Sequence, residues 1–308
     1  MAPTEPTSLA LISYPTHPSA VSENPRCAAE AQVISRTTGG PITGSRLVTD
    51  LRALGVTPGM TLLVHSSLSS LGWVVDGAET VVLALEEALG STVTLMMPAY
   101  SYDAPEPSEW ENPPVPESWW ATIREEWPPY DGRWARSQHL GVIAETFRTQ
   151  PGTLRSPHPS LSFSARGPQA PTLVGNHSLE NAAGDGSPLA RLYDLGGYVL
   201  LLGVGHDSNS SLHLSETRAH WPGREEMRSR KGKWVREGRV EEFLLLDFNW
   251  HSEEFGSLGK DLESETRSVS IGPVGISESR LMPQRTLVDF GVRWIEHHRN
   301  KVPDPPSA

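Results

Sequence analysis

Residues 61–97 read TLLVHSSLSSLGWVVDGAETVVLALEEALGSTVTLMM and contain two apolar runs separated by an amphipathic segment. The runs at 60–65 and 92–97 have the length and composition of buried strands. Between them, apolar residues recur at helical spacing over 81–89. A strand, a helix and a second strand at this spacing predict a crossover unit, in which the two strands lie parallel in one sheet.

The same alternation continues to the end of the chain. The clearest buried strand is YVLLLGVG at 198–205, and residues 233–246 are typical of a hairpin that turns at Glu237-Gly238. Further helices are predicted over 47–54 and 138–149, from Ser187-Pro188 onward and from Pro283 onward. The sequence therefore predicts an α/β fold, with a mainly parallel central sheet flanked by helices and an extra hairpin.

Segments of biased composition divide the chain. Residues 1–41 are rich in Pro, Ser, Thr and Ala without sustained periodicity, and we expect a disordered or loosely docked extension. Residues 42–301 form the predicted domain, and residues 302–308 form a tail. Within the domain, residues 103–136 hold many prolines and five tryptophans, which either pack this insertion down or line a cleft.

Composition excludes several classes of partner. The formal net charge of −11 over 308 residues makes nucleic acid and anionic membranes poor partners. The single cysteine, Cys27, rules out an internal disulfide and a cysteine zinc site. No apolar run approaches the roughly 18 residues of a membrane span. We expect a cytoplasmic protein, either monomer or dimer.

Three polar loops follow predicted strands: HSSLSSLG at 65–72, PAYSYD at 98–103 and GHDSNSS at 205–211. In an open α/β sheet, ligands bind beyond the carboxyl ends of the strands, so these loops should converge on one crevice. Their serines would otherwise be ordinary turn residues. The chain has no G-x-x-x-x-G-K-[ST], G-x-G-x-x-G or G-x-S-x-G motif.

Individual polar residues each allow two interpretations. His158 lies between two prolines that stiffen its backbone, which suits a general base but also a surface turn. Glu216 could orient an imidazole or lie on a solvated helix face. Asp207 could cap the following helix or hold a cationic ligand. His206, His213 and His220 recur every seven residues, whereas zinc pairs favour i, i+4, and we expect no metal.

Several segments, taken together and in order, resemble the aminoglycoside 3-N-acetyltransferase family. They are LLVHSSLSSLGWVVDGAETVVLALEEALG, TLMMPAYSYD, NPPVPESWW, GVIAETFRTQPGTLRSPHPSLSFSARGPQA, SPLARLYDLGGYVLLLGVGHDSNSSLHLSETRA and PQRTLVDFGVRWIEHHR. The resemblance covers about residues 43–300 and leaves out the N-terminal extension. It implies an α/β fold distinct from the common acetyltransferase superfamily, whose Q/R-x-x-G-x-G/A signature the chain lacks.

The resemblance also implies roles for single residues. The family's base is the histidine of its HP motif, here His158, and its partner is the glutamate of LHLSE, here Glu216. Ser210 stands where threonine is usual and keeps a hydroxyl for the thioester carbonyl. The HSSLSSLG loop is similar to the family's CoA-binding segment, which implies acetyl-CoA contacts from Ser66, Ser67, Leu68, Ser69 and Gly72.

The implied reaction is direct acetyl transfer from acetyl-CoA to the 3-amine of 2-deoxystreptamine, which inactivates the antibiotic. We expect Asp207, Tyr102 and Asp103 to bind the polycationic substrate. Two alternatives remain open at this point. The acceptor is another biosynthetic amine, or the protein sequesters aminoglycosides without catalysis.

Overall fold

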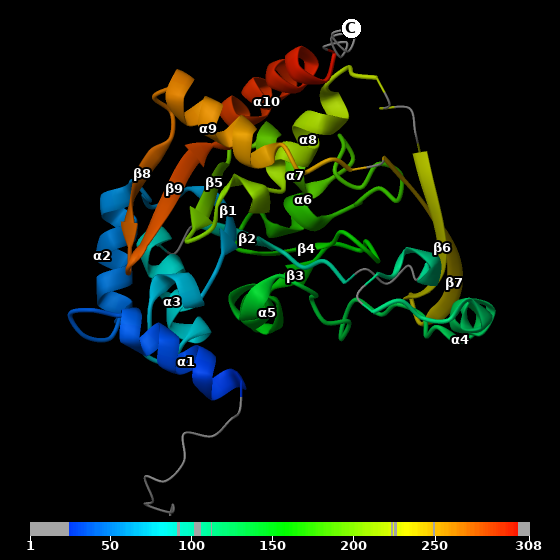
Figure 1. The fold of residues 1–308 in the computed structure, drawn as a ribbon, viewed down its shortest axis with the longest axis horizontal. Helices are drawn as coiled ribbons and strands as arrows, with labels where there is room; N and C mark the ends of the chain where they lie inside the picture. The colour runs from blue at the N-terminus through cyan, green and yellow to red at the C-terminus, as the bar shows by residue number, and fades with distance from the viewer. Residues whose placement is uncertain are drawn as a thin grey trace, which may run out of the picture.

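The computed structural model describes residues 25–90, 93–101, 106–111, 113–222, 224, 227–248 and 250–300. The predicted substrate-binding residues Tyr102 and Asp103 lie outside these ranges. The described elements form a seven-stranded sheet in the order β3-β4-β2-β1-β5-β9-β8, with helices on both faces and a separate two-stranded hairpin (Figure 1). The predicted α/β class is confirmed.

Three parallel strands form the centre of the sheet: β1 (Thr61–Ser66), β2 (Thr94–Pro98) and β5 (Tyr198–Leu202). Leu62 is aligned with Leu95 on one side and Tyr198 on the other. Every residue of β2 is buried, as its apolar sequence predicts for a strand covered on both faces. The parallel pairing predicted from residues 60–97 is therefore confirmed.

Antiparallel strands complete both sides of the sheet and were not predicted from the sequence. They are β4 (Phe163–Arg166) and β3 (Leu154–Arg155) beside β2, and β9 (Ser277–Pro283) and β8 (Ser270–Val274) beside β5. These segments are short or rich in Ser, Arg and Gly, so they lack the apolar run of a central strand.

Helices cover the two faces in separate groups (Figure 1). Alternate residues of β1 face opposite cores, with Leu62 in one and Leu63 in the other. The first core contains α2 (Gly44–Leu54), α3 (Ala78–Leu89) and α5 (Gly141–Thr149). The second face carries α6 (Ala170–Val174), α7 (Pro188–Asp194), α8 (Ser211–Arg218), α9 (Phe255–Glu265) and α10 (Gln284–Arg299). None of the helices in the described ranges is long and apolar enough to cross a membrane.

The predicted hairpin stands apart from the sheet (Figure 1) and comprises β6 (Met227–Arg236) and β7 (Arg239–Phe248). It turns at Glu237-Gly238, where both residues have positive φ, as tight hairpin turns require. Its partner is the Trp-rich insertion, which contains η2 (Pro107–Glu109), η3 (Glu117–Trp119) and α4 (Trp120–Glu126). Tyr130 of the insertion and Trp234 of β6 join the two segments in a small core. Trp234 therefore packs the hairpin against the insertion.

Part of the N-terminal extension is helical. Residues 25–36 form α1, a helix that was not predicted from the sequence. Arg36 donates a hydrogen bond to the Ser69 carbonyl at 3.2 Å, and Thr37 Oγ1 accepts one from the Trp73 amide at 2.7 Å. Most of α1 is exposed, so these few contacts carry much of its attachment.

One glycine fixes the distance between α9 and the loop after β5. A Cβ at Gly259 would overlap the ring of His206, whereas a Cβ at Gly256 would have no heavy atom within 4 Å. His206 is buried and bonds through Nε2 to Glu263 at 3.0 Å, so it cannot swing away without losing that contact. The close approach therefore sets the position of the neighbouring Asp207.

We expect Gly259→Ala to reduce the free energy of unfolding by about 1–3 kcal/mol, because overpacking outweighs the helix propensity of alanine. The matched control in the same helix is Gly256→Ala, which should be neutral or stabilising by up to about 1 kcal/mol. Urea denaturation measures both. Equal effects of the two substitutions would contradict the packing argument.

Candidate active site

A cavity of about 990 Å³ lies at the carboxyl ends of the three parallel strands. It is lined by residues from 64–77 after β1, from 98–100 after β2 and from 204–210 after β5. The prediction that these three loops converge on one crevice is confirmed. A volume of this size lies at the upper end of the range of small-molecule sites.

The serine-rich loop forms one wall of this cavity. All five residues of this loop that were predicted to contact acetyl-CoA line it: Ser66, Ser67, Leu68, Ser69 and Gly72. The Ser67 amide donates to the Leu202 carbonyl at 3.1 Å, which ties the loop to the end of β5. The Ser70 hydroxyl bonds to Ser67 Oγ at 2.9 Å. The wall therefore presents hydroxyls that the neighbouring strand holds in place.

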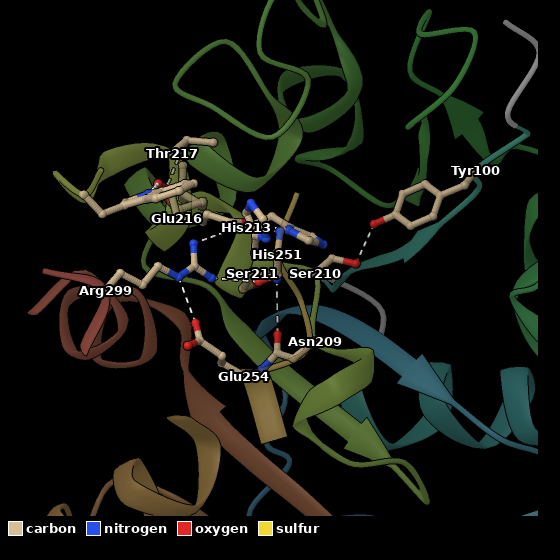
Figure 2. A network of polar contacts seen from close by, with 12 residues as sticks. Tyr100, Asn209, Ser210, Ser211, His213, Glu216, Thr217, His251, Glu254 and Arg299 are labelled. Atoms are coloured by element: carbon tan, nitrogen blue, oxygen red, sulfur yellow. Dashed lines mark hydrogen bonds and ion pairs between the residues drawn. The ribbon is translucent and has the colours of Figure 1, made fainter. Parts of the chain in front are cut away.

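A hydroxyl pair and a carboxylate also line the cavity. The Tyr100 hydroxyl and Ser210 Oγ are 2.5 Å apart, and both residues line the cavity (Figure 2). Asp207 also lines it, within the short turn η4 (His206–Ser208). Helix α8 begins at Ser211 with Ser210 as its N-cap, so Asp207 is not the cap of that helix. The structure leaves its carboxylate at the cavity.

A histidine and a glutamate form a hydrogen-bonded pair on α8. His213 Nδ1 lies 3.1 Å from Glu216 Oε2, because residues three apart share one helix face (Figure 2). The edges of Trp250 and Phe255 pack against the imidazole at centroid distances of 4.3 and 4.9 Å. His213 lines the cavity and is partly exposed to it. No hydrogen-bond partner of its Nε2 lies within the described ranges.

Glu216 is 2% exposed and shares its charge among three partners. Its Oε1 accepts hydrogen bonds from the His251 amide at 2.9 Å and from Arg299 Nη1 at 2.7 Å. Burial alone raises the pKa of this carboxyl, but the hydrogen bonds and charges of His213 and Arg299 hold it below the ordinary value. Glu216 is therefore ionised at neutral pH.

The predicted pairing of His158 with Glu216 is wrong. His158 is fully buried and does not line the cavity. Its Nδ1 accepts the backbone amides of Ser160 and Leu161 at 3.1 and 2.9 Å. Burial, and then the neighbouring His177, lower its pKa well below the ordinary value. The imidazole points into the protein, where it accepts two backbone amides.

His65 is a site residue that sequence reasoning missed. It ends the apolar part of β1, lines the cavity and is 5% exposed. Burial first, and then the proximity of His213, lower its pKa to about 3, so its imidazole is neutral. Its Nε2 has no hydrogen-bond partner in the described part of the chain. Its place directly before the serine cluster was the available signal.

The charged residues around the cavity have one sign. Glu30 of α1, Asp76 and Asp207 line it, and the described lining includes no lysine or arginine. The three evenly spaced histidines have separate partners, since His206 contacts Glu263 and His220 contacts Arg224. Among the described residues, no group of three or more His, Cys, Asp or Glu side chains could hold a metal ion.

Residues 63–296 match the family model described as aminoglycoside 3-N-acetyltransferase. Aminoglycoside N(3)-acetyltransferase VIII of Streptomyces fradiae is 36% identical to this chain, covering 87% of this chain and 96% of that protein. The crystal structure of YokD from Bacillus subtilis is similar with a TM-score of 0.83 and 37% identity, covering 88% of this chain and 99% of that one.

Two further similar structures carry ligands. AAC-IIIb, binary with CoASH, has a TM-score of 0.75 and 29% identity, covering 86% of this chain and all of that one. AAC-VIa bound to sisomicin has a TM-score of 0.75 and 32% identity, covering 85% of this chain and all of that one.

Replacing Glu216 by Gln should reduce the free energy of unfolding at pH 7 by about 3 kcal/mol, because the buried guanidinium of Arg299 would keep only the partly exposed Glu254 as a carboxylate partner. The folded protein holds the pKa of Glu216 below its ordinary value of 4.5, so its ionisation stabilises the fold above that value. This stabilisation is lost as the pH falls through the lower, folded-state pKa.

The difference between the unchanged protein and Glu216→Gln should therefore be largest near neutral pH and shrink in acid. Urea denaturation as a function of pH measures it. A difference that stays constant or grows as the pH falls would show that the Glu216 charge does not stabilise the fold.

Proposed function

The chain belongs to the aminoglycoside 3-N-acetyltransferase family, and on that premise we propose that it transfers an acetyl group directly from acetyl-CoA to the 3-amine of an aminoglycoside, with His213 as the general base. The observation that carries this proposal is the His213–Glu216 pair, whose imidazole lines the cavity of about 990 Å³. This assignment replaces the predicted base His158.

The geometry of the pair suits proton removal from an amine. Glu216 is ionised and accepts the Nδ1 proton of His213, which leaves the Nε2 lone pair to accept a proton from the substrate. An aminoglycoside amine is largely protonated at neutral pH and cannot attack a thioester until it loses a proton. The attacking amine has already given its first proton to solvent. His213 would take the second as nitrogen attacks the carbonyl carbon, and CoA would leave as the thiolate.

The hydroxyl pair suits the charge that develops on the thioester oxygen. Tyr100 and Ser210 line the cavity with their hydroxyls within hydrogen-bond distance of each other. We place the thioester carbonyl beside them, where a positioned donor stabilises the developing oxyanion. The lining hydroxyls of Ser66, Ser67 and Ser69 would hold the rest of the donor, and the CoASH complex of AAC-IIIb supports a CoA site in this fold.

The carboxylates of the cavity favour a cationic acceptor. Glu30, Asp76 and Asp207 would attract the ammonium groups of an aminoglycoside and discriminate against neutral amines. The sisomicin complex of AAC-VIa supports an aminoglycoside as the acceptor in this fold.

Thiol release from acetyl-CoA across an amine panel tests the substrate class. We expect turnover with gentamicin, sisomicin or apramycin, and NMR of the product should place the acetyl group on the 3-amine. An aminophosphonate is the contrasting acceptor, because its anionic group would face the carboxylates of the cavity. Turnover with the aminophosphonate and with no aminoglycoside would contradict the proposal and point to another biosynthetic amine.

Substituting the two histidines separately tests the base. His213→Ala should lower kcat by about 10²–10⁴-fold while the protein stays folded, because it removes the proton acceptor. His158→Ala should instead reduce the free energy of unfolding by about 1–3 kcal/mol, because two buried amides lose their acceptor. Its folded fraction should retain most of the activity. The reverse pattern would restore His158 as the base.

A further inference from the structure

Arg299, in the last turn of α10, holds Glu216 from the side opposite His213 (Figure 2). Its Nη1 bonds to Glu216 Oε1 at 2.7 Å, its Nε to Glu254 at 2.8 Å and its Nη2 to the His251 carbonyl at 2.7 Å. The guanidinium also lies over the ring of Trp221 at 4.7 Å. The side chain is 9% exposed, so its position is determined by these contacts.

These contacts join three separate segments around the pair. Arg299 belongs to α10, Glu216 belongs to α8, and residues 250–254 belong to the segment between the hairpin and α9. The same segment supplies Trp250, which packs on His213, and Ser252, which lines the cavity. A substitution at Arg299 is therefore expected to affect the positions of the Glu216 carboxylate and of the Trp250 ring, both of which contact His213.

The two carboxylate oxygens of Glu216 contact different partners. One contacts His213 and the other contacts Arg299, so the guanidinium compensates the buried carboxylate before the imidazole gains a proton. Its positive charge also opposes a second positive charge on His213. The other titratable or charged groups facing the pair are His65 on β1, Asp247 on β7, and His251 and Glu254 before α9.

We propose that Arg299 is a positioning residue for acetyl transfer, which fixes the Glu216 carboxylate against His213 and so orients the imidazole that accepts the substrate proton. This inference rests on the proposed function, in which His213 is the base. Arg299 does not line the cavity, so it acts through Glu216 and not on the substrate.

Three variants separate this role from simple anchoring of the C-terminal helix. Arg299→Gln removes both the charge and the planar set of guanidinium N–H donors. Arg299→Lys keeps the charge but not this set of donors. Arg293→Gln is the matched control, because Arg293 is exposed on the same helix. Each variant is compared at a temperature where thermal unfolding shows that it is folded.

Steady-state kinetics as a function of pH give the first readout. Arg299→Gln should lower kcat at least about tenfold with little change in KM for the amine, since the imidazole is then oriented less precisely toward the amine. The acidic limb of its pH profile should move to higher pH by about one unit, because the uncompensated Glu216 stabilises protonated His213. Arg299→Lys should keep the limb near its original position with a lower kcat, and Arg293→Gln should change neither.

NMR of the histidine ring carbons gives a second readout that does not require turnover. The midpoint of the His213 titration should rise in Arg299→Gln and stay in place in Arg293→Gln. An unchanged midpoint and an unchanged limb, in a folded variant, would overturn the positioning role. If His213→Ala keeps its activity, the proposed base is wrong, whereas a shifted midpoint in Arg299→Gln would still show the electrostatic coupling.

Discussion

The buried carboxylate of Glu216 is the constraint around which the site is arranged. An ionised carboxylate out of contact with water is strongly unfavourable unless hydrogen bonds and an opposite charge compensate it. The fold supplies a guanidinium from the end of α10, an amide from the segment before α9 and an imidazole from the same helix. Because each donor comes from a different part of the chain, compensating this one charge also holds His213 at the cavity.

The central architecture could be predicted from sequence because it depends on local patterns. The apolar runs ending at His65 and Met97 are too short for helices and too apolar for surface strands. The helix between them allows the second strand to lie parallel to the first. Parallel strands bring their following loops to one edge of the sheet, which is why Ser66, Asp207 and Ser210 were correctly placed around a single cavity.

The remaining features depend on contacts that sequence patterns do not encode. Pro157 and Pro159 indicate a rigid turn, but the direction of the His158 imidazole is decided by the amides that it accepts. The pairing of His213 with Glu216 had a local signal, since residues at i, i+3 share a helix face. Arg299 lies 83 residues from Glu216 and had no such signal. The helix over 25–36 was hidden by the compositional bias of the extension.

The most direct test is a crystal structure of the protein with an aminoglycoside and CoA. The account predicts that the 3-amine lies within hydrogen-bond distance of His213 Nε2, at about 3 Å. Glu216 should remain on Nδ1, the CoA sulfur should lie beside Ser210, and His158 should make no contact with either ligand. A 3-amine that lies against another side chain, or an aminoglycoside bound outside the cavity at the ends of β1, β2 and β5, would contradict it.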